Sequence, residues 1–272
     1  MISRRFFIYF CLNAFLFIFM KFNFISRVFS KESSKTRIMT NPIFFKHHIS
    51  PDHPETPERI KYILELLKKK NEIRNLLENV NVNFEIDEWI LKIHTKKHIE
   101  SLRRMFPLAE KVSSAAIKVC ITALNEIMNK KIKNVFCAVR PPGHHALNTG
   151  KEEGFCYYNH IAILAKYAQQ KYNLKKILIV DWDYHHGNST EHFFYDDPSI
   201  LFFSTHDAVA YPGTGSPTKK GTGDGYGFNI NVHLPCGTND KKIIDSFNNI
   251  LLPKVKIFKP ENKLSVVINQ ND

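Results

Sequence analysis

The stretch KKILIVDWDYHHGN, residues 175–188, carries the strongest structural signal in the chain. It opens with a short apolar run of β-forming residues, which is typical of a buried strand. Asp181, Asp183 and His185 follow at alternate positions. If the strand geometry continues through them, all three side chains point to one side. The sequence therefore predicts ionisable groups gathered at the carboxyl end of a buried strand.

Two buried carboxylates need a positive partner, because an unpaired buried charge costs several kcal/mol of stability. A divalent metal ion would supply that charge, and aspartate oxygen and histidine nitrogen are ordinary zinc ligands. A second segment, RPPGHHA at residues 140–146, offers His144 and His145 from the loop after the neighbouring apolar strand. The alternative interpretation of the first segment is an ion-paired loop with surface histidines.

A helix is predicted where apolar residues follow a start signal. In TPERIKYILELLKKK, residues 56–70, Thr56 is placed as an N-cap and Pro57 stands in the first turn. The apolar residues of this segment recur at helical spacing and predict one buried face, made of Ile60, Ile63, Leu64 and Leu67.

Helix and strand signals alternate from about residue 41 to about residue 260. Helices are also predicted at residues 114–129 and 160–172, and strands at 134–139, 175–183, 199–205 and 226–234. Strands separated by helices predict an α/β fold with a mainly parallel central sheet that is covered on both faces. Ligands gather beyond the carboxyl ends of such strands. No internal repeat or long linker interrupts this pattern, so one domain is expected.

The formal net charge is +12, from 38 basic and 26 acidic residues. Such a balance would by itself suggest nucleic acid or an anionic surface as a partner. Residues 1–40, however, hold seven basic residues against the single acid Glu32, so half of the net charge lies there. Short basic runs elsewhere are typical of solvated surfaces. We therefore expect no direct sequence-specific binding to nucleic acid.

Residues 1–40 have the composition of a targeting leader. MISRR is a basic start, and FFIYFCLNAFLFIFM, residues 6–20, is a 15-residue apolar run, shorter than the roughly 20 residues of a membrane span. Residues 21–40 are basic and Ser-containing, like an organelle transit segment. We predict a signal peptide and a secretory, plastid or other organelle route, with membrane contact only through this leader. The alternatives are a signal anchor, or mispredicted coding sequence upstream of Met39 with residence in the nucleus or cytoplasm.

The cysteines form no C-x-x-C pair and are odd in number: Cys11, Cys120, Cys137, Cys156 and Cys236. This pattern favours reduced, mostly buried thiols over a disulfide framework or a cysteine zinc site.

Several motifs in a fixed order carry a family resemblance. RPPGHHA, GFCYYN, VDWDYHHGN, DDPSILFFSTH and YPGTG resemble the successive motifs of the zinc-dependent histone deacetylase family, and HPETPERI fits its N-terminal part. The resemblance covers roughly residues 41–260 and is closer to the class II-like and the bacterial or plastid-type members. It implies an arginase/deacetylase-type three-layer α/β fold for a domain at residues 41–272.

The resemblance also implies a zinc centre. Asp183 and His185 match two of the three zinc ligands of the family. His144 and His145 match its paired active-site histidines, and His145 would transfer the proton in the reaction. The implied reaction is hydrolysis of an acetyl amide by zinc-activated water.

Supporting roles follow from the same resemblance. Asp181 would orient His144 and, together with Ser204, would face a structural potassium ion. Asn188 would hold His145 from behind. A histidine that acts as a base needs its second ring nitrogen fixed in this way.

Substrate contacts are implied at three positions. Gly154 would accept a hydrogen bond from the substrate through its carbonyl oxygen. Phe155 and Tyr211 would form the two walls of a narrow tunnel for the acyl-lysine stem, since flat apolar faces suit its methylene groups.

The sequence departs from the family pattern in three places. The third zinc ligand, an Asp in a segment of the type S-A-G-F-D-A, and the catalytic Tyr of a Gly-Gly-Tyr motif have no counterpart before Asp272. The substrate-gripping Asp is also absent between Arg104 and Ser113. We therefore expect a deacetylase domain that is incomplete at its C-terminus.

Three functions are compatible with these motifs. The favoured one is deacetylation of acetyl-lysine in histone tails or other proteins, with a part in chromatin regulation. The second is an amidohydrolase of acetylated small amines of the polyamine type. The third is a catalytically inactive, deacetylase-like binding fragment, because the third zinc ligand and the catalytic Tyr are missing.

Overall fold

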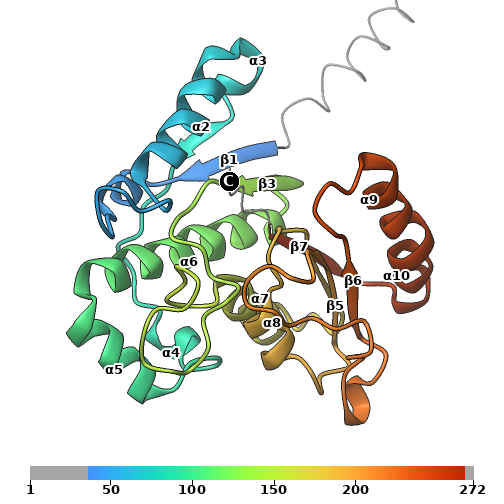
Figure 1. Ribbon diagram of the computed structural model, residues 1–272. Coiled ribbons are helices and arrows are strands. Elements are labelled where there is room, and N and C mark those ends of the chain that lie inside the picture. Colours follow the sequence, from blue (N-terminus) through green and yellow to red (C-terminus); the bar gives the residue numbers. More distant parts are fainter. Residues whose placement is uncertain (1–35, 267–272) are drawn as a thin grey trace, which may run out of the picture.

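The computed structural model describes residues 36–266 and has the predicted α/β architecture, with parallel sheets flanked by helices (Figure 1). The first sheet has three strands in the order β2-β1-β3. Its strands are β1 (Thr36–Thr40), β2 (Leu77–Asn79) and β3 (Asn134–Cys137). Both strand pairs are parallel, with Ile38 opposite Leu77 and opposite Phe136.

The second sheet has four strands in the order β6-β5-β4-β7, again all parallel. Its strands are β4 (Ile177–Asp181), β5 (Ile200–His206), β6 (Asn229–His233) and β7 (Asn262–Val266). Asp181, the last residue of β4, stands opposite Ser204 of β5. The predicted mainly parallel sheet is therefore present, but within residues 36–266 it is divided in two.

Helices pack around both sheets, and α9 and α10 lie on the side of the molecule away from α2 and α3 (Figure 1). The helices and 3-10 or π turns are η1 (Pro42–Lys46), α2 (Pro57–Lys69), α3 (Asn71–Arg74), α4 (Asp87–Ile90), α5 (Lys96–Met105), α6 (Pro107–Met128), α7 (His160–Tyr172), α8 (Asn188–Phe193), η2 (Gly223–Gly225), α9 (Asp240–Ser246), η3 (Phe247–Leu251) and α10 (Leu252–Phe258).

Helix α6 connects the cores of the two sheets because it is apolar on two sides. Its Val112 and Ala116 pack with Met39 of β1 in one buried cluster. Its Ile117 packs in another buried cluster with Ile179 of β4. Each large aliphatic side chain buried in this way contributes about 1.5–3 kcal/mol.

The predicted helix at residues 160–172 has the observed bounds of α7, and Asn159 caps it by accepting a hydrogen bond from the Ala162 N–H at 2.9 Å. Helix α2 also starts at Pro57 as predicted, although Thr56 makes no capping hydrogen bond to the helix. On its predicted buried face Ile60 and Leu64 are buried, whereas Ile63 is exposed.

A strand is present within residues 134–139 as predicted, but the prediction that it is buried is wrong. β3 is short, and Phe136 is 44% exposed. The reason is its position, because in residues 36–266 β3 pairs only with β1 and forms an edge.

The predicted boundary between leader and domain after residue 40 is too late. Residues Thr36–Thr40 form β1, the middle strand of the first sheet, and Met39 is fully buried. The apolar run at residues 6–20 lies outside the described part of the chain. Within that part, no helix has the length and apolar character needed to cross a membrane.

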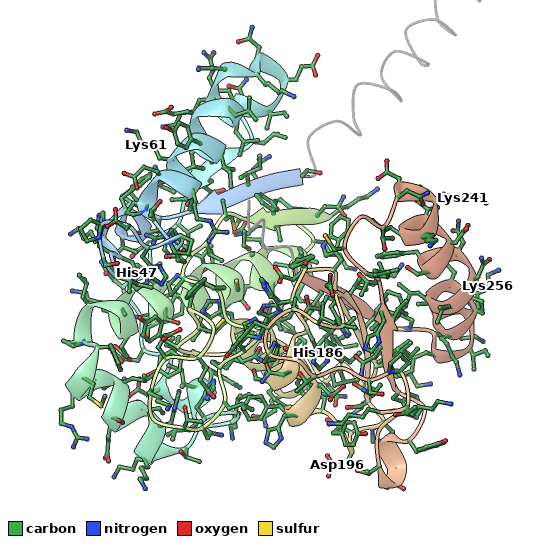
Figure 2. All side chains as sticks on the ribbon, in the orientation of Figure 1. His47, Lys61, His186, Asp196, Lys241 and Lys256 are labelled. Carbon is green, nitrogen blue, oxygen red and sulfur yellow. The ribbon has the colours of Figure 1, made fainter. Side chains whose placement is uncertain are left out.

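The lysines of the two short basic runs, residues 68–70 and 130–133, are exposed, as expected for solvated runs. Figure 2 shows Lys61, Lys241 and Lys256 projecting outward from α2, α9 and α10. The four cysteines of the described residues are free thiols, Cys120, Cys137, Cys156 and Cys236.

Candidate functional site

Two loops meet at the carboxyl ends of β3 and β4, and together they carry the predicted site residues. We call residues 138–146 the β3 arm and residues 182–188 the β4 arm. The β3 arm is tied to β1 where Thr40 Oγ1 donates to the Ala138 carbonyl oxygen at 2.8 Å. The strands β3 and β4 belong to different sheets, and hydrogen bonds from His144 to Asp181 and from His145 to Asn188 join the two arms.

The β3 arm is anchored by Arg140, which is almost completely buried. Its guanidinium donates through Nε to Glu55 Oε1 at 2.9 Å and through Nη2 to the other carboxylate oxygen. Nη1 donates to the main-chain oxygens of Phe44 and, at 2.7 Å, of His47. A bidentate pair of this kind fixes both position and orientation. The segment that follows, with both histidines, therefore starts from a fixed point.

His144 crosses from the β3 arm to β4. Its Nδ1–H donates to Asp181 Oδ2 at 2.8 Å, and both side chains are buried. Burial by itself would lower the pKa of His144, but the negative charge of Asp181 and this hydrogen bond outweigh it and leave the pKa raised. Gly187 makes the contact possible, because a Cβ at that position would overlap Asp181 Oδ2.

His145 has a different partner, and its pKa is shifted in the opposite direction. Its Nδ1–H donates to Asn188 Oδ1 at 2.7 Å. Burial and the neighbouring His144 lower the pKa of His145 to about 2, so the ring is neutral at ordinary pH. The hydrogen bond to Asn188 selects the tautomer with the proton on Nδ1. The free lone pair is then on Nε2.

Asp183 and His185 lie beside this pair. Asp183 is buried, and His144 Nε2 approaches its Oδ1 to 3.7 Å. His185 Nδ1 lies 3.3 Å from Asp183 Oδ1, and the His185 main-chain N–H donates to the same oxygen at 2.7 Å. Asp183 Oδ2 and His185 Nδ1 are both buried atoms without a hydrogen-bond partner. Such atoms in a folded protein call for an ion or a water molecule.

The donor set fits zinc in kind. A carboxylate oxygen and an imidazole nitrogen, both buried and both unpaired, are ordinary zinc donors. Within residues 36–266, no group of three His, Cys, Asp or Glu side chains is arranged to hold a metal ion. Asp183 and His185 would therefore supply at most two of the four donors that a tetrahedral zinc ion needs.

Gly154 and Tyr211 border the two histidines. The Tyr211 ring meets the His145 ring edge-on, with centroids 4.9 Å apart, and its centroid lies 6.3 Å from that of His185. Gly154 has a φ of +53° and faces the rings of His145 and Tyr211. A Cβ at this position would overlap His145 and stand 2.8 Å from Tyr211 Cε1. The predicted substrate-contacting glycine and one predicted tunnel wall are thus neighbours of His145.

Phe155, the other predicted wall, packs edge-on against His53 with ring centroids 4.5 Å apart. Ser204 lies opposite Asp181 in the sheet register, but its hydroxyl is paired with His206 Nδ1 at 2.9 Å. Asp181 Oδ1 accepts a hydrogen bond from the Asp183 N–H at 3.2 Å. The structure therefore brings together most of the predicted residues, with Phe155 and Ser204 engaged by further partners.

Sequence reasoning did not single out three supporting features of the site. These are the Glu55–Arg140 pair, the space provided by Gly187, and a buried carboxylate, Glu191, which accepts hydrogen bonds from Asn229 and Asn231. The only local signal for Gly187 is its place directly after two histidines. The other pairs join positions far apart in the chain, and no local pattern marks them.

Comparison with known proteins places these motifs in one family. The family model for the histone deacetylase domain matches residues 53–268. A probable deacetylase of Archaeoglobus fulgidus is 35% identical in an alignment of 247 positions that covers 83% of this chain and 66% of the relative. Histone deacetylase 10, chloroplastic, of Oryza sativa subsp. japonica is 32% identical over 244 residues, covering 79% of this chain and 55% of the relative. The chain thus spans about two thirds and about half the length of these relatives.

A solved structure shares the fold. The crystal structure of the HDA15 HD domain superposes with a TM-score of 0.79 and 28% sequence identity, covering 86% of this chain and 72% of that chain.

Proposed function

The chain belongs to the histone deacetylase domain family, and from that premise we propose that it serves to hydrolyse the acetyl amide of acetyl-lysine in histones or other proteins. The observation that carries the proposal is the position of two buried ligand atoms without a hydrogen-bond partner, on Asp183 and His185, beside two adjacent histidines that are held by different partners, Asp181 and Asn188. Metal-dependent amide hydrolysis uses a Lewis acid beside a base, and this arrangement supports both.

His145 is the proposed proton acceptor. Its Nδ1–H is held by Asn188, so Nε2 is free to take a proton from the attacking water. His144, held by Asp181 and with a raised pKa, would hold a proton next to it. Titratable groups whose surroundings push their pKa values apart divide the roles of acid and base between them.

Asp183 and His185 would hold zinc, and a bound zinc ion would activate the amide carbonyl and water as a Lewis acid. Gly154 would accept a hydrogen bond from the substrate, while Phe155 and Tyr211 would flank its stem. Asp181 and Ser204, which are register partners, would face a structural potassium ion. These roles all remain proposals for this chain.

The proposal is tested by measuring zinc and turnover separately. Zinc bound by the purified 272-residue chain is measured by equilibrium dialysis and elemental analysis. Turnover is measured on an acetyl-lysine peptide and on acetylated spermidine, with zinc added. We expect Asp183→Ala to lose zinc. Asn188→Ala should keep zinc but lose roughly 10–100-fold in kcat, because the tautomer of His145 is no longer fixed.

His192→Ala is the matched control, since this histidine on α8 packs on Phe193 rather than on either arm. It should leave zinc binding and turnover unchanged. Equal losses in Asn188→Ala and His192→Ala would contradict the role of His145. Turnover of the polyamine alone would replace acetyl-lysine by a small acetylated amine as the substrate.

A second function, an inactive deacetylase-like binding module, is favoured by one observation. Only two zinc donors come together in residues 36–266, and no group of three is arranged for a metal ion. Binding of an acetyl-lysine peptide without turnover, at saturating zinc, would select this alternative.

The organelle route predicted from residues 1–40 is compatible with the rice relative, whose name describes it as chloroplastic. Imaging of a reporter fused to these residues tests the route, and a diffuse cytoplasmic signal would contradict it.

A further inference from the structure

Gly154 and Phe155 form the tip of a short hairpin in residues 147–159, which we call the tip loop and which connects the β3 arm to α7. The two residues have φ values of +53° and +66°. They lie between Glu153 and Cys156, which exchange main-chain hydrogen bonds at 3.0 and 2.9 Å. A two-residue turn with both φ values positive is a common hairpin connection. A bulky residue such as Phe155 keeps a positive φ only where its surroundings enforce it.

Behind this bridge, a histidine side chain joins the two sides of the tip loop. Within the described residues, no further main-chain hydrogen bond connects the two sides. His98, a buried residue of α5, lies between them. Its Nδ1 accepts a hydrogen bond from the Gly150 N–H at 2.9 Å, and its Nε2–H donates to the Tyr157 carbonyl oxygen at 2.9 Å. One imidazole ring thus connects the two sides of the hairpin.

His94, just before α5, makes the same kind of connection further from the tip. Its Nε2 accepts a hydrogen bond from the Asn159 N–H at 2.9 Å, and its Nδ1–H donates to Asn148 Oδ1 at 3.2 Å. The rings of His94 and His98 stack with centroids 4.8 Å apart and 20° between their planes. The joined positions are nested, because 148 pairs with 159, 150 with 157, and 153 with 156. Each ring therefore stands where a regular hairpin would have a pair of main-chain hydrogen bonds.

The two bridging rings need opposite tautomers. Because a main-chain N–H donates to Nε2 of His94 and to Nδ1 of His98, the ring proton is on Nδ1 of His94 and on Nε2 of His98. Burial, and then the neighbouring His98, lowers the pKa of His94 to about 3. Burial also lowers the pKa of His98, and it outweighs the Tyr157 carbonyl oxygen and the charge of Glu153. Both rings are therefore neutral at ordinary pH, and only a neutral ring can both donate and accept.

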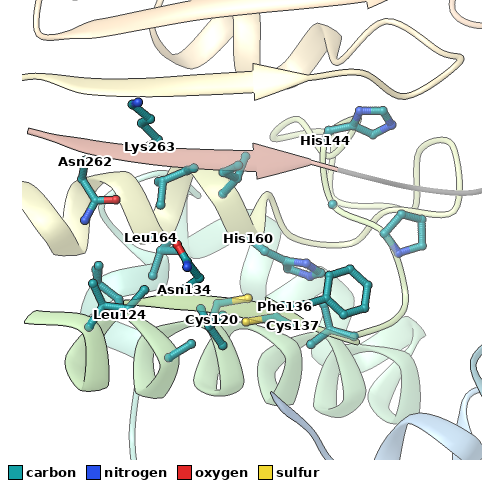
Figure 3. A pocket seen from close by; sticks show the side chains of 18 of the residues that line it. Cys120, Leu124, Asn134, Phe136, Cys137, His144, His160, Leu164, Asn262 and Lys263 are labelled. Carbon is teal, nitrogen blue, oxygen red and sulfur yellow. The ribbon is translucent and has the colours of Figure 1, made fainter. Parts of the chain in front are cut away.

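His160, which directly follows Asn159, is buried too but has a different environment. Its Nε2 lies 3.1 Å from the hydroxyl of Ser113 on α6. Figure 3 shows His160 among the residues that line a cavity of about 610 Å³ between β3 and β7. The bonds on both sides of the tip loop therefore distinguish His94 and His98 from this third buried histidine.

We propose that His94 and His98 are positioning residues, a histidine clasp that holds the tip loop closed and thereby places Gly154 beside His145. The tip has little freedom to move at that point, because a Cβ on Gly154 would overlap the His145 ring. An opened tip loop would withdraw the Gly154 carbonyl oxygen and the Phe155 ring from the site. The effect on substrate rests on the proposed function, whereas the closure of the tip loop does not.

The first experiment reads the tautomers in the full 272-residue wild-type chain. Long-range proton–nitrogen spectra of the imidazole rings, recorded at neutral pH on a chain with ¹⁵N-labelled histidine, distinguish Nδ1–H from Nε2–H. We expect a neutral Nδ1–H ring for His94 and a neutral Nε2–H ring for His98. The signals are assigned by their loss in His94→Phe and His98→Phe. A charged ring, or the same tautomer in both residues, would overturn the proposal.

The second experiment measures hydrogen exchange of the Gly150 amide relative to the amides of β5, which is buried at every position. His98→Phe keeps an aromatic ring against His94 but removes both bonds to the tip loop. We expect the Gly150 amide to exchange about tenfold faster in this variant, the change expected for the loss of about one hydrogen bond. His98→Asn should restore the protection, because its side-chain oxygen takes the place of Nδ1 as acceptor.

Leu102→Ala is the matched control. Leu102 lies on the same helix, α5, and is fully buried, so its truncation weakens the packing of the helix. The variant keeps both histidines, and the exchange of the Gly150 amide relative to β5 should therefore stay unchanged. Equal acceleration in Leu102→Ala and His98→Phe, or no acceleration in His98→Phe, would overturn the histidine clasp.

The third experiment connects the histidine clasp to the site. The Kd of a fluorescent acetyl-lysine peptide, measured by anisotropy at saturating zinc, should rise about tenfold in His98→Phe, as expected for one lost hydrogen bond. It should stay near the wild-type value in His98→Asn. Faster exchange at Gly150 with an unchanged Kd would overturn the role of the histidine clasp at the site.

A wild-type chain that does not bind the peptide would contradict the proposed function instead, and the exchange rates would still decide whether the histidine clasp closes the tip loop. Because the tautomers are read in the wild-type chain, a variant that fails to fold does not remove the test.

Discussion

The two arms of the site are built alike but supported differently. Each follows the carboxyl end of a parallel strand and carries two residues of the central cluster, His144 and His145 on one arm and Asp183 and His185 on the other. Within the described residues 36–266, β4 has a neighbour on both edges and ends in buried Asp181, whereas β3 has one neighbour and is half exposed.

The difference shows two ways to fix a loop at the end of a strand. The β4 arm inherits its position from a strand enclosed on both edges. The β3 arm depends instead on side-chain bonds, above all those of Arg140 to Glu55 and to nearby carbonyl oxygens. Removing such side-chain bonds should therefore affect the β3 arm more than equivalent changes affect the β4 arm.

The largest effect is expected from breaking the anchor of the β3 arm. Glu55→Ala leaves the buried Arg140 guanidinium without its carboxylate and should cost about 3–5 kcal/mol of unfolding free energy. Urea denaturation measures this change. Lys131→Ala, which removes the exposed ion pair with Glu126, is the control and should cause no measurable change. Similar losses of unfolding free energy in both variants would mean that the buried Glu55–Arg140 pair stabilises the protein no more than an exposed ion pair does.

A smaller effect is expected from filling the space beside each arm. Gly143→Ala would press a methyl group on the Tyr158 carbonyl oxygen at 2.7 Å and the His160 nitrogen at 2.9 Å. Gly187→Ala would press on the Asp181 carboxylate. Overpacking of this kind costs about 1–3 kcal/mol, and Gly143→Ala should cost more, because main-chain atoms cannot swing aside.

Thermal unfolding of both glycine variants tests that order. In Gly187→Ala the nuclear magnetic resonance signal of the His144 Nδ1 proton should also be lost, because the hydrogen bond to Asp181 is displaced. A retained signal would show that the carboxylate moves without releasing the histidine.

The smallest effect over any one pH unit is expected from acid. Burial, and then the charge of Arg140, lowers the pKa of His47 near the β3 arm to about 4. The unfolded chain therefore binds more protons than the folded chain between pH about 6.5 and about 4, and stability falls as the pH falls through this window. One such histidine changes the unfolding free energy by at most about 1.4 kcal/mol per pH unit. His47→Gln should therefore make the fall of unfolding free energy between pH about 6.5 and about 4 less steep by up to that amount.

Glu191, near the β4 arm, should respond only in stronger acid. Burial would raise its pKa, but His186, Asn231 and Asn229 outweigh burial and lower the pKa to about 2. The contribution of Glu191 to the unfolding free energy is therefore complete above pH about 4.5 and is lost as the pH falls toward about 2. Glu191→Gln should leave the dependence of the unfolding free energy on pH unchanged above pH about 4.5. Urea midpoints across these pH ranges distinguish the two variants, and identical pH profiles would contradict the comparison.

Local signals predicted the elements well where a start signal and a period coincide. Pro57 and the apolar period after it gave the start of α2, whereas for α7 the period of residues 160–172 alone was enough. Residues 36–40 were missed as β1, because a basic segment next to an apolar leader has no strand signal of its own. The exposure of Phe136 was missed too, since an apolar run does not reveal how many neighbours its strand will have.

The sequence by itself determined which chemical groups end the strands: two aspartates and a histidine after one, and a histidine pair after another. It did so because strand alternation and loop placement are local properties of the chain. Only the tertiary structure decided that His144 meets Asp181 while His145 meets Asn188, and that β3 and β7 face each other across a cavity. Those outcomes depend on contacts between residues far apart in the chain, and burial and charge at such contacts set the pKa values of the two histidines.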